Sequence, residues 1–292
     1  MSTATSSTPT AASSTASSTD AAEGPRPGAA PAVQVEPVTQ VRVVVSEWIK
    51  MRSLRSTGFT LLAAVTAMTG IGWIICSATA SRWSRMPPGR LAEFNPVDTS
   101  LAGFHLAQLA VGVLGVLLVT GEYATGMIRA TFGAAPRRLP VLWAKTGLYA
   151  VVTFVLLLVA AFAAFLGGQQ FLGTHGTTLS ADGAVRAVIG VAGYLTLIGM
   201  FAVALGFLIR STAGGIATLF GLLLVAPGLG ELLPSDWQPH ILPYLPGNAG
   251  EAMFAVHPGA GSLSAGAGLA VLVTWVVVAL AAAAVLLARR DA

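Results

Sequence analysis

Four histidines are the residues of this chain best suited to bind a metal ion or to move a proton near neutral pH. A metal site needs ligands at characteristic spacings, or a cysteine or carboxylate paired with them, and the sequence has neither pattern. The single cysteine, Cys76, predicts no disulfide framework. Segment 234–264 contains serine and histidine but no G-x-S-x-G nucleophile sequence. We therefore expect no enzyme and no metal centre, and interpret the histidines as exposed loop residues: His105, His175, His240 and His257.

The chain's two lysines, Lys50 and Lys145, are the only residues that could serve a phosphate-binding loop, which needs a lysine directly after a glycine. They follow Ile49 and Ala144, so no such loop is present. The stretch LGGQQ (166–170) is superficially similar to the signature of transport ATPases, but it lies at the end of an apolar run. We expect the chain to bind no cofactor, and any ATP to be bound by a partner.

The positions of the histidines and lysines depend on the long apolar runs that make up most of the chain. Mean hydropathy is +0.76, 54% of residues are apolar and 10% are charged, whereas a soluble domain is about a quarter charged. No acid or base lies at the centre of a run, and the nearest, His105 and Glu231, lie close to run ends, which disfavours an ion-coupled carrier. The sequence therefore predicts an all-α integral membrane protein with six spans. The spans are 58–80, 101–120, 146–167, 187–209, 213–233 and 266–288.

Lysine and arginine are distributed unevenly between the predicted connections. With the amino terminus in the cytoplasm, twelve lie on that side and four on the other. The positive-inside rule then places both termini in the cytoplasm, although the basic segment RWSRMPPGR (82–90) opposes it. Topology and anionic lipid explain the positive charge, so we expect no nucleic-acid partner. Residues 1–40, rich in Ser, Thr and Ala, predict a disordered cytoplasmic tail without a cleaved signal, leaving the first span as signal anchor.

Residues 41–56, VRVVVSEWIKMRSLRS, predict an amphipathic helix before the first span. We expect it to lie in the cytoplasmic interface with Trp48 as an anchor, while Arg52 and Arg55 reach lipid phosphates. The alternative is a basic stretch that only sets topology. On a helical wheel Val41, Val44, Val45, Trp48, Ile49 and Met51 share the apolar side, and Ser46, Glu47, Lys50 and Ser53 share the polar side.

The connection 121–145 opens with GEYATGMIRATFGAAPRR (121–138), which predicts a short helix over 122–132, stopped by Gly133 and Pro136. Glu122 near its amino end would suit the helix dipole. Met127, Ile128 and Phe132 would form an apolar side that nothing in the chain covers, which suggests a partner groove. Alternatively the helix lies flat on lipid, with Arg129, Arg137 and Arg138 as topology markers.

The outer connection 234–264 has three aromatic residues and several prolines. It predicts short helices in the outer interface. Gly247, Asn248 and Gly250 are interpreted as turn residues.

Four segments in this order resemble the permease subunits of ABC-2 type transporters, especially bacterial ones whose ATPase is a separate chain: SEWIKMRS, GEYATGMIRATFGAAPRR, YLPGNAG (244–250) and the terminal ARRDA. The resemblance covers about 41–292. It implies a connecting helix before span one, a coupling helix between spans two and three that seats in the ATPase, and two permease subunits, identical or paralogous. It also implies export from the bacterial cell. The implied connecting-helix residues are Glu47, Trp48, Lys50 and Arg52. The implied ATPase-coupling residues are Glu122, Tyr123, Met127, Ile128, Arg129, Phe132, Pro136, Arg137 and Arg138.

Two other functions remain open. A membrane scaffold or sensory subunit could bind a partner through the same connection and conduct nothing, and an ion-coupled carrier is the third possibility. The residues expected to face a pathway, for example on spans two and five, are small and apolar. Such a lining is compatible with lipids, hydrophobic drugs or peptides as substrates and selects none of them.

Overall fold

The computed structural model describes residues 39–128, 131, 139–259 and 261–289, all of which belong to one unit, Val38–Ala292. These residues are helical throughout their ordered elements, with no strand among them. The predicted tail, 1–40, lies outside this description except for Thr39 and Gln40. All-helical architecture is therefore confirmed for the part of the chain that is described.

The six predicted spans are confirmed as helices long and apolar enough to cross a membrane. Spans one and five are each interrupted by a turn of π-helix, so each is built from three consecutive pieces. Span one comprises α2 (Arg55–Thr66), η1 (Ala67–Ile71) and α3 (Gly72–Arg82); span two, α5 (Pro96–Leu101) and α6 (Phe104–Ala124); span three, α8 (Leu139–Leu172). Span four is α9 (Ala184–Ile209); span five, α10 (Thr212–Phe220), η4 (Gly221–Val225) and α11 (Ala226–Gly230); span six, α14 (Ala265–Arg289).

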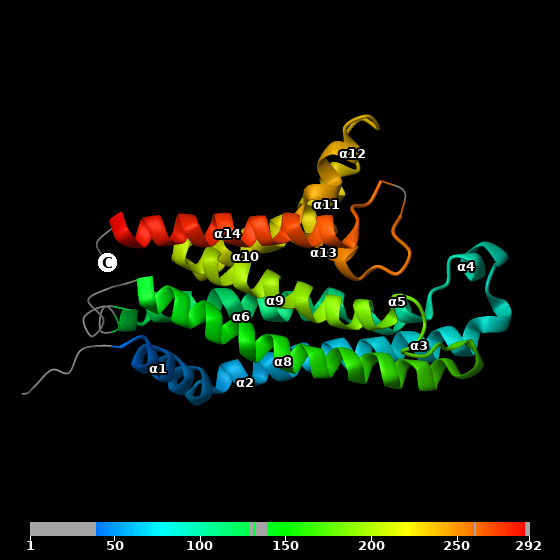
Figure 1. Cartoon of the computed structure of the whole chain (residues 1–292), viewed down its shortest axis with the longest axis horizontal. Coiled ribbons are helices and arrows are strands. Elements are labelled where there is room, and N and C mark those ends of the chain that lie inside the picture. Colours follow the sequence, from blue (N-terminus) through cyan, green and yellow to red (C-terminus); the bar gives the residue numbers. More distant parts are fainter. Residues whose placement is uncertain (1–38, 129–130, 132–138, 260, 290–292) are drawn as a thin grey trace, which may run out of the picture. The chain divides into compact units, whose positions relative to one another are not determined.

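Shorter elements occupy both ends of the bundle (Figure 1). We call one the α1 end: it contains α1 (Gln40–Ser53), the C-terminal ends of α6 and α14, and the N-terminal end of α8. The opposite one is the α4 end. It holds η2 (Trp83–Arg85), α4 (Pro88–Ala92) and η3 (Gly173–His175). The connection between spans five and six forms α12 (Gln238–Ile241), η5 (Leu242–Tyr244) and α13 (Pro246–Phe254).

Spans two and three extend beyond the predicted limits of 101–120 and 146–167. Helix α6 continues to Ala124, and Gly126 follows it with φ +70°. Helix α8 already begins at Leu139. The left-handed Gly126 ends α6, whereas hydropathy marks only the part of a helix that matches lipid. Charged residues near 122 and 145 consequently belong to span helices.

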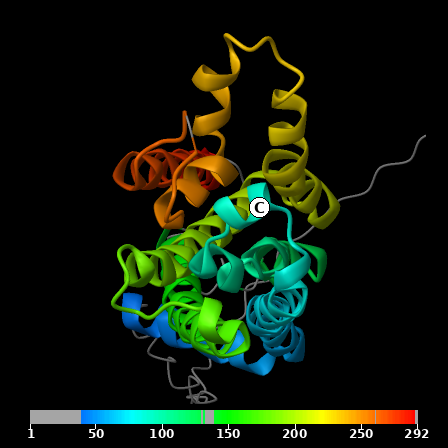
Figure 2. The ribbon, with the colours of Figure 1, turned by 90° about the vertical axis from the view of Figure 1, so that its right-hand side faces the viewer.

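Helix α9 is the central element of the bundle (Figure 2). It packs against α6, α8, α10, α13 and α14, and 72% of the residues in its most apolar 18-residue stretch are buried. In the corresponding stretches of spans one, five and six only 22%, 22% and 28% of the residues are buried. Their apolar outer faces are therefore left for lipid or for another chain.

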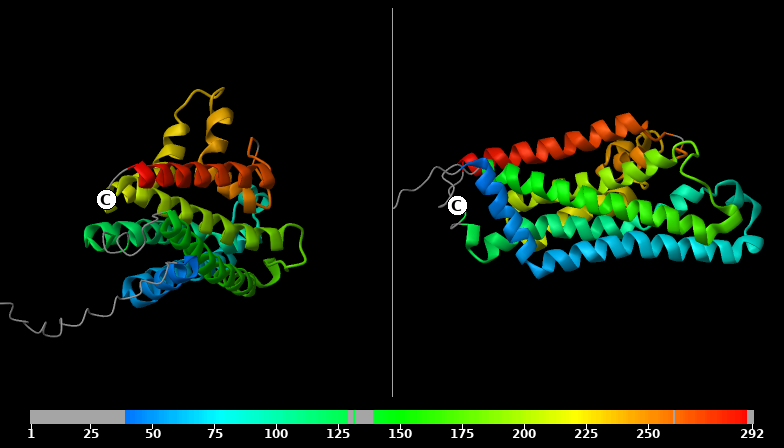
Figure 3. Two further views of the ribbon diagram at one scale, coloured as in Figure 1. Left: turned by 60° about the vertical axis from the view of Figure 1, so that its left-hand side comes forward. Right: turned by 60° about the horizontal axis from the view of Figure 1, so that its bottom comes forward.

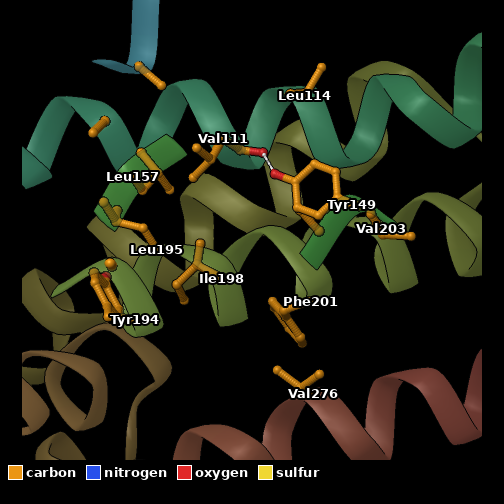
Figure 4. Close-up of a cluster of buried hydrophobic side chains, with 14 of the residues drawn as sticks. Val111, Leu114, Tyr149, Leu157, Tyr194, Leu195, Ile198, Phe201, Val203 and Val276 are labelled. Atoms are coloured by element: carbon orange, nitrogen blue, oxygen red, sulfur yellow. Dashed lines mark hydrogen bonds between the residues drawn. The ribbon is translucent and has the colours of Figure 1, made fainter. Parts of the chain in front are cut away.

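Small residues let the central helices approach closely, as is usual where packing in lipid supplies the attraction. A methyl group added at Gly115 of α6 would lie 2.6 Å from the carbonyl oxygen of Gly199 on α9. The buried hydroxyl of Tyr149 on α8 donates to the carbonyl of Val111 on α6 at 2.6 Å (Figure 4). These contacts join α6, α8 and α9 into one packed core.

Short helices between spans five and six match the prediction for 234–264, but the turn assignment within it was wrong. Gly247, Asn248 and Gly250 lie inside α13, which packs on α9 and α14. Gly250 is needed for close packing, because a side chain there would enter the ring of Tyr194.

Candidate functional site

Helix α1 lies across the end of the bundle against α8 (Figure 3). It ends where Leu54 adopts an extended conformation, with φ −81° and ψ 107°, so the chain turns before α2 enters span one. The predicted amphipathic helix is therefore present but ends three residues before the predicted limit of 56. Arg52 is exposed in its last turn, and Arg55 starts α2.

The side of α1 that faces the protein carries Glu47 between two apolar residues. Val43, Glu47 and Met51 form the buried stripe, four residues apart. Met51 was predicted on the apolar outer side, and its burial corrects that assignment. The exposed stripe is apolar, as expected of a helix lying against lipid rather than water. Its members are Val41, Val44, Val45, Trp48 and Ile49.

Glu122 lies in the last turn of α6 and does not begin a separate helix. The prediction of a helix over 122–132 with Glu122 at its amino end was therefore wrong at that end. A carboxylate near a helix carboxyl terminus is opposed by the helix dipole, so Glu122 needs compensating charge from elsewhere. It is 6% exposed, which makes that need stronger.

Both lysines of the chain supply the compensating charge. Lys145 Nζ, on the second turn of α8, donates to Glu122 Oε1 at 2.8 Å and to Glu47 Oε2 at 2.5 Å. Lys50 Nζ donates to Glu47 Oε1 at 2.8 Å and to Glu122 Oε1 at 3.3 Å. We call Glu47, Lys50, Glu122 and Lys145 the ion cluster. It ties α1, α6 and α8 together at the α1 end.

The ion cluster is electrically balanced and deeply placed. The side chain of Lys145 is 1% exposed and that of Glu47 3%, whereas that of Lys50 is 26% exposed. Two ammonium groups neutralise two carboxylates, yet Glu122 Oε2 is buried with no hydrogen-bond partner in the part of the chain described. A buried ion network of this kind adds little net stability compared with an apolar replacement, but it fixes which groups must meet. Its main effect is to define one relative position of three helices.

Further contacts attach the close of α6 to the turn between α9 and α10. The guanidinium of Arg210, which caps α9 with φ 55°, lies 5.2 Å from the ring centre of Tyr123. The hydroxyl of Thr212 donates to that of Thr120 at 2.8 Å. The last turn of α6 is thus connected to α1, α8, α9 and α10.

The segment after Gly126 reaches the same cluster. Lys50 Nζ donates to the hydroxyl of Thr131 at 3.1 Å. Ile128 is buried, which corrects the prediction that nothing in the chain covers this apolar side, while Met127 is 42% exposed. The remaining predicted residues lie outside the described ones: Arg129, Phe132, Pro136, Arg137 and Arg138.

Sequence reasoning missed Lys145 as a member of the ion cluster and Thr131 as a hydrogen-bond partner of Lys50. Lys145 had been placed just outside span three, as one of several charges that set topology. A usable signal was present: the chain has fourteen arginines and two lysines, and both lysines lie here. A compact ammonium with three donors can bridge carboxylates from two helices, which suits this position.

The four histidines do not assemble into a site. Within the described ranges no group of three or more His, Cys, Asp or Glu side chains could hold a metal ion. His175 stacks on Trp83, and His257 hydrogen-bonds Asn95 at 2.8 Å. No protein-family model matches the chain, and no curated protein matches it significantly. Function must therefore be inferred from the ion cluster and its surroundings.

Raising the pH is expected to release α1 from the cluster. Burial alone would lower the pKa of Lys50, but its hydrogen bond to Glu47 and the charges of Glu47 and Glu122 outweigh burial and raise the pKa above the ordinary 10.5. Stabilisation by this ammonium is therefore complete below 10.5 and is lost as the pH rises through the raised pKa. A nitroxide at Ser53→Cys, in a Cys76→Ala background, should become mobile across that range.

A Lys50→Arg variant is the matched control for this titration. A guanidinium stays protonated beyond about pH 12, so the onset of label mobility should move upward. An unchanged onset would assign the transition to another group and contradict the role given to Lys50.

Proposed function

We propose that this chain is the membrane permease subunit of an ABC-2 type transporter, driven by a separate ATPase that docks on the 121–138 segment. Six apolar helices, an oblique helix before span one and the resemblance of four segments support the proposal. The observation that carries it is the ion cluster. It joins the predicted connecting helix to both helices that flank the predicted docking segment, and to Thr131 within that segment.

This arrangement suits the transfer of movement from a docked partner. A displacement of the docking segment would act on the last turn of α6, and the ion cluster would pass it to α1 and α8. Arg210 and Thr212 would pass it to α9 and α10. Nucleotide binding that closes a pair of ATPases could then favour one arrangement of the spans over another, because the partner binds the two states unequally.

The proposal includes orientation, assembly and direction. The α1 end faces the cytoplasm of a bacterial cell, with both termini there, and the spans cross the plasma membrane. A second permease copy or a paralogue packs on the sparsely buried outer spans. ATP is bound by the partner ATPase, and the pair exports its substrate.

Substituting Met127 tests the docking segment without disturbing the core. Met127 is 42% exposed beside the turn at Gly126, so Met127→Asp should leave the fold intact while placing a charge in the docking surface. The few hot-spot residues of an interface each cost about 2 kcal/mol or more when altered. If Met127 is one of them, co-purification of the partner ABC ATPase should fall roughly tenfold or more. The matched control is Leu232→Asp, at a residue 81% exposed that should keep full co-purification.

Two results would change the proposal. Undiminished co-purification of the Met127→Asp variant would place the docking surface elsewhere. A stable complex that hydrolyses ATP at the rate of the isolated ATPase would favour the scaffold or sensory subunit over the transporter.

A further inference from the structure

Three arginines at the α4 end have no role in the proposed function. Arg82, Arg85 and Arg90 lie on the side that the positive-inside rule leaves poor in positive charge. All three are exposed, and none makes a side-chain hydrogen bond or ion pair with the described residues. Topology and ion pairing therefore both fail to explain them.

The local fold holds these arginines in fixed positions. Trp83 stacks on His175 of η3, with ring centres 3.8 Å apart and an interplanar angle of 13°. Its edge meets Phe94 at 4.9 Å. Because Trp83 is anchored on two sides, η2 cannot turn freely, and Arg82 and Arg85 on either side of it stay at the end of span one. Pro87 and Pro88 stiffen the step to Arg90.

A hollow of about 740 Å³ is lined by the three arginines together with apolar residues. The apolar part of its lining comes from span one and the turn after it, with Ile75, Ala78 and Met86 among its residues, and we call this part the floor. Ligand sites of several hundred Å³ commonly combine such a floor with a few charged groups at the rim. This hollow is large enough for part of an amphiphile and carries three positive charges.

We propose that this hollow binds the phosphate of an anionic lipid, with the start of an acyl chain on the apolar floor. Arginine forks match phosphate oxygens, and three of them concentrate positive charge where lipid headgroups lie at the end of a span. The floor continues onto the outer face of α3, where Ile74 is 66% exposed and open to a chain. A free phosphate would use the arginines and leave the floor unoccupied. This inference uses the orientation included in the proposed function but does not depend on transport or on the ATPase.

Native mass spectrometry of the full chain in neutral detergent tests the site. Phosphatidylglycerol should be retained at least about tenfold more tightly than phosphatidylcholine with the same acyl chains. The variant Arg82→Gln/Arg85→Gln/Arg90→Gln should lose this preference. It should keep its unfolding temperature, because exposed side chains without contacts contribute little to folding.

Two further variants separate the site from general effects. The variant Arg289→Gln removes an exposed positive charge from the α1 end and should keep the preference. Ala78→Phe fills the floor and should lose the lipid while keeping all three charges. Equal retention of the two lipids, loss of preference in the α1-end variant, or binding of inorganic phosphate as tightly as the lipid would each overturn the proposal.

Discussion

Replacing Lys145 by methionine is expected to lower the free energy of unfolding of the six-span unit by about 3–5 kcal/mol. Lys145 Nζ bridges Glu47 and Glu122 from α8, and its side chain is 1% exposed. Its removal leaves two buried carboxylates opposite the single, partly exposed ammonium of Lys50. Reversible unfolding in mixed micelles, followed by far-UV circular dichroism, measures the change.

Arg289→Met is the matched control, because it removes one positive charge from an exposed position in the last turn of α14. A change within about 0.5 kcal/mol is expected for it. Adding Glu47→Gln to Lys145→Met should recover part of the loss, since one uncompensated charge disappears. Equal stabilities of Lys145→Met and Arg289→Met would contradict the burial and pairing assigned to Lys145.

The six spans were predictable because a long apolar helix is the main way for a chain to satisfy its backbone in lipid. Their ends were not, because hydropathy changes where the chain leaves hydrocarbon, while a helix continues until its hydrogen bonding is interrupted. Gly126 is the residue that interrupts α6. Because the end of span two was placed at 120 instead of 124, Glu122 was predicted at the start of a new helix. The helix dipole was then expected to stabilise its carboxylate, whereas near the end of α6 the dipole opposes it.

The ion cluster was partly predictable. The helical wheel of α1 correctly grouped Glu47 with Lys50, but it did not show that these side chains meet other helices rather than the membrane interface. In a helix lying between protein and lipid, the polar side can face the protein instead, where ionic partners are available. Those partners are 72 and 98 residues away along the chain, and no local pattern reports a contact at that separation.

Converting the whole ion cluster to neutral side chains is expected to keep the fold and abolish coupling to the ATPase. In the variant Glu47→Met/Lys50→Met/Glu122→Met/Lys145→Met no buried charge or amide is left without a partner. Replacing a buried ion network in full is often neutral or stabilising by about 1–4 kcal/mol, in contrast to removal of one member. The variant should therefore unfold no more easily than the wild type.

Coupling should respond differently, which separates a structural role of the ion cluster from transmission of movement. Met127, the exposed apolar residue of the docking segment, is unchanged, so co-purification of the ATPase should persist. The difference in ATP hydrolysis rate between the complex and the isolated ATPase should fall by at least about fivefold. Thr196→Val serves as a control, because it removes a buried hydroxyl that bonds only within α9 and should leave the rate difference intact. Full stimulation in the neutral variant would show that the partner's movement enters the bundle without the cluster, by way of Arg210 and Thr212 alone.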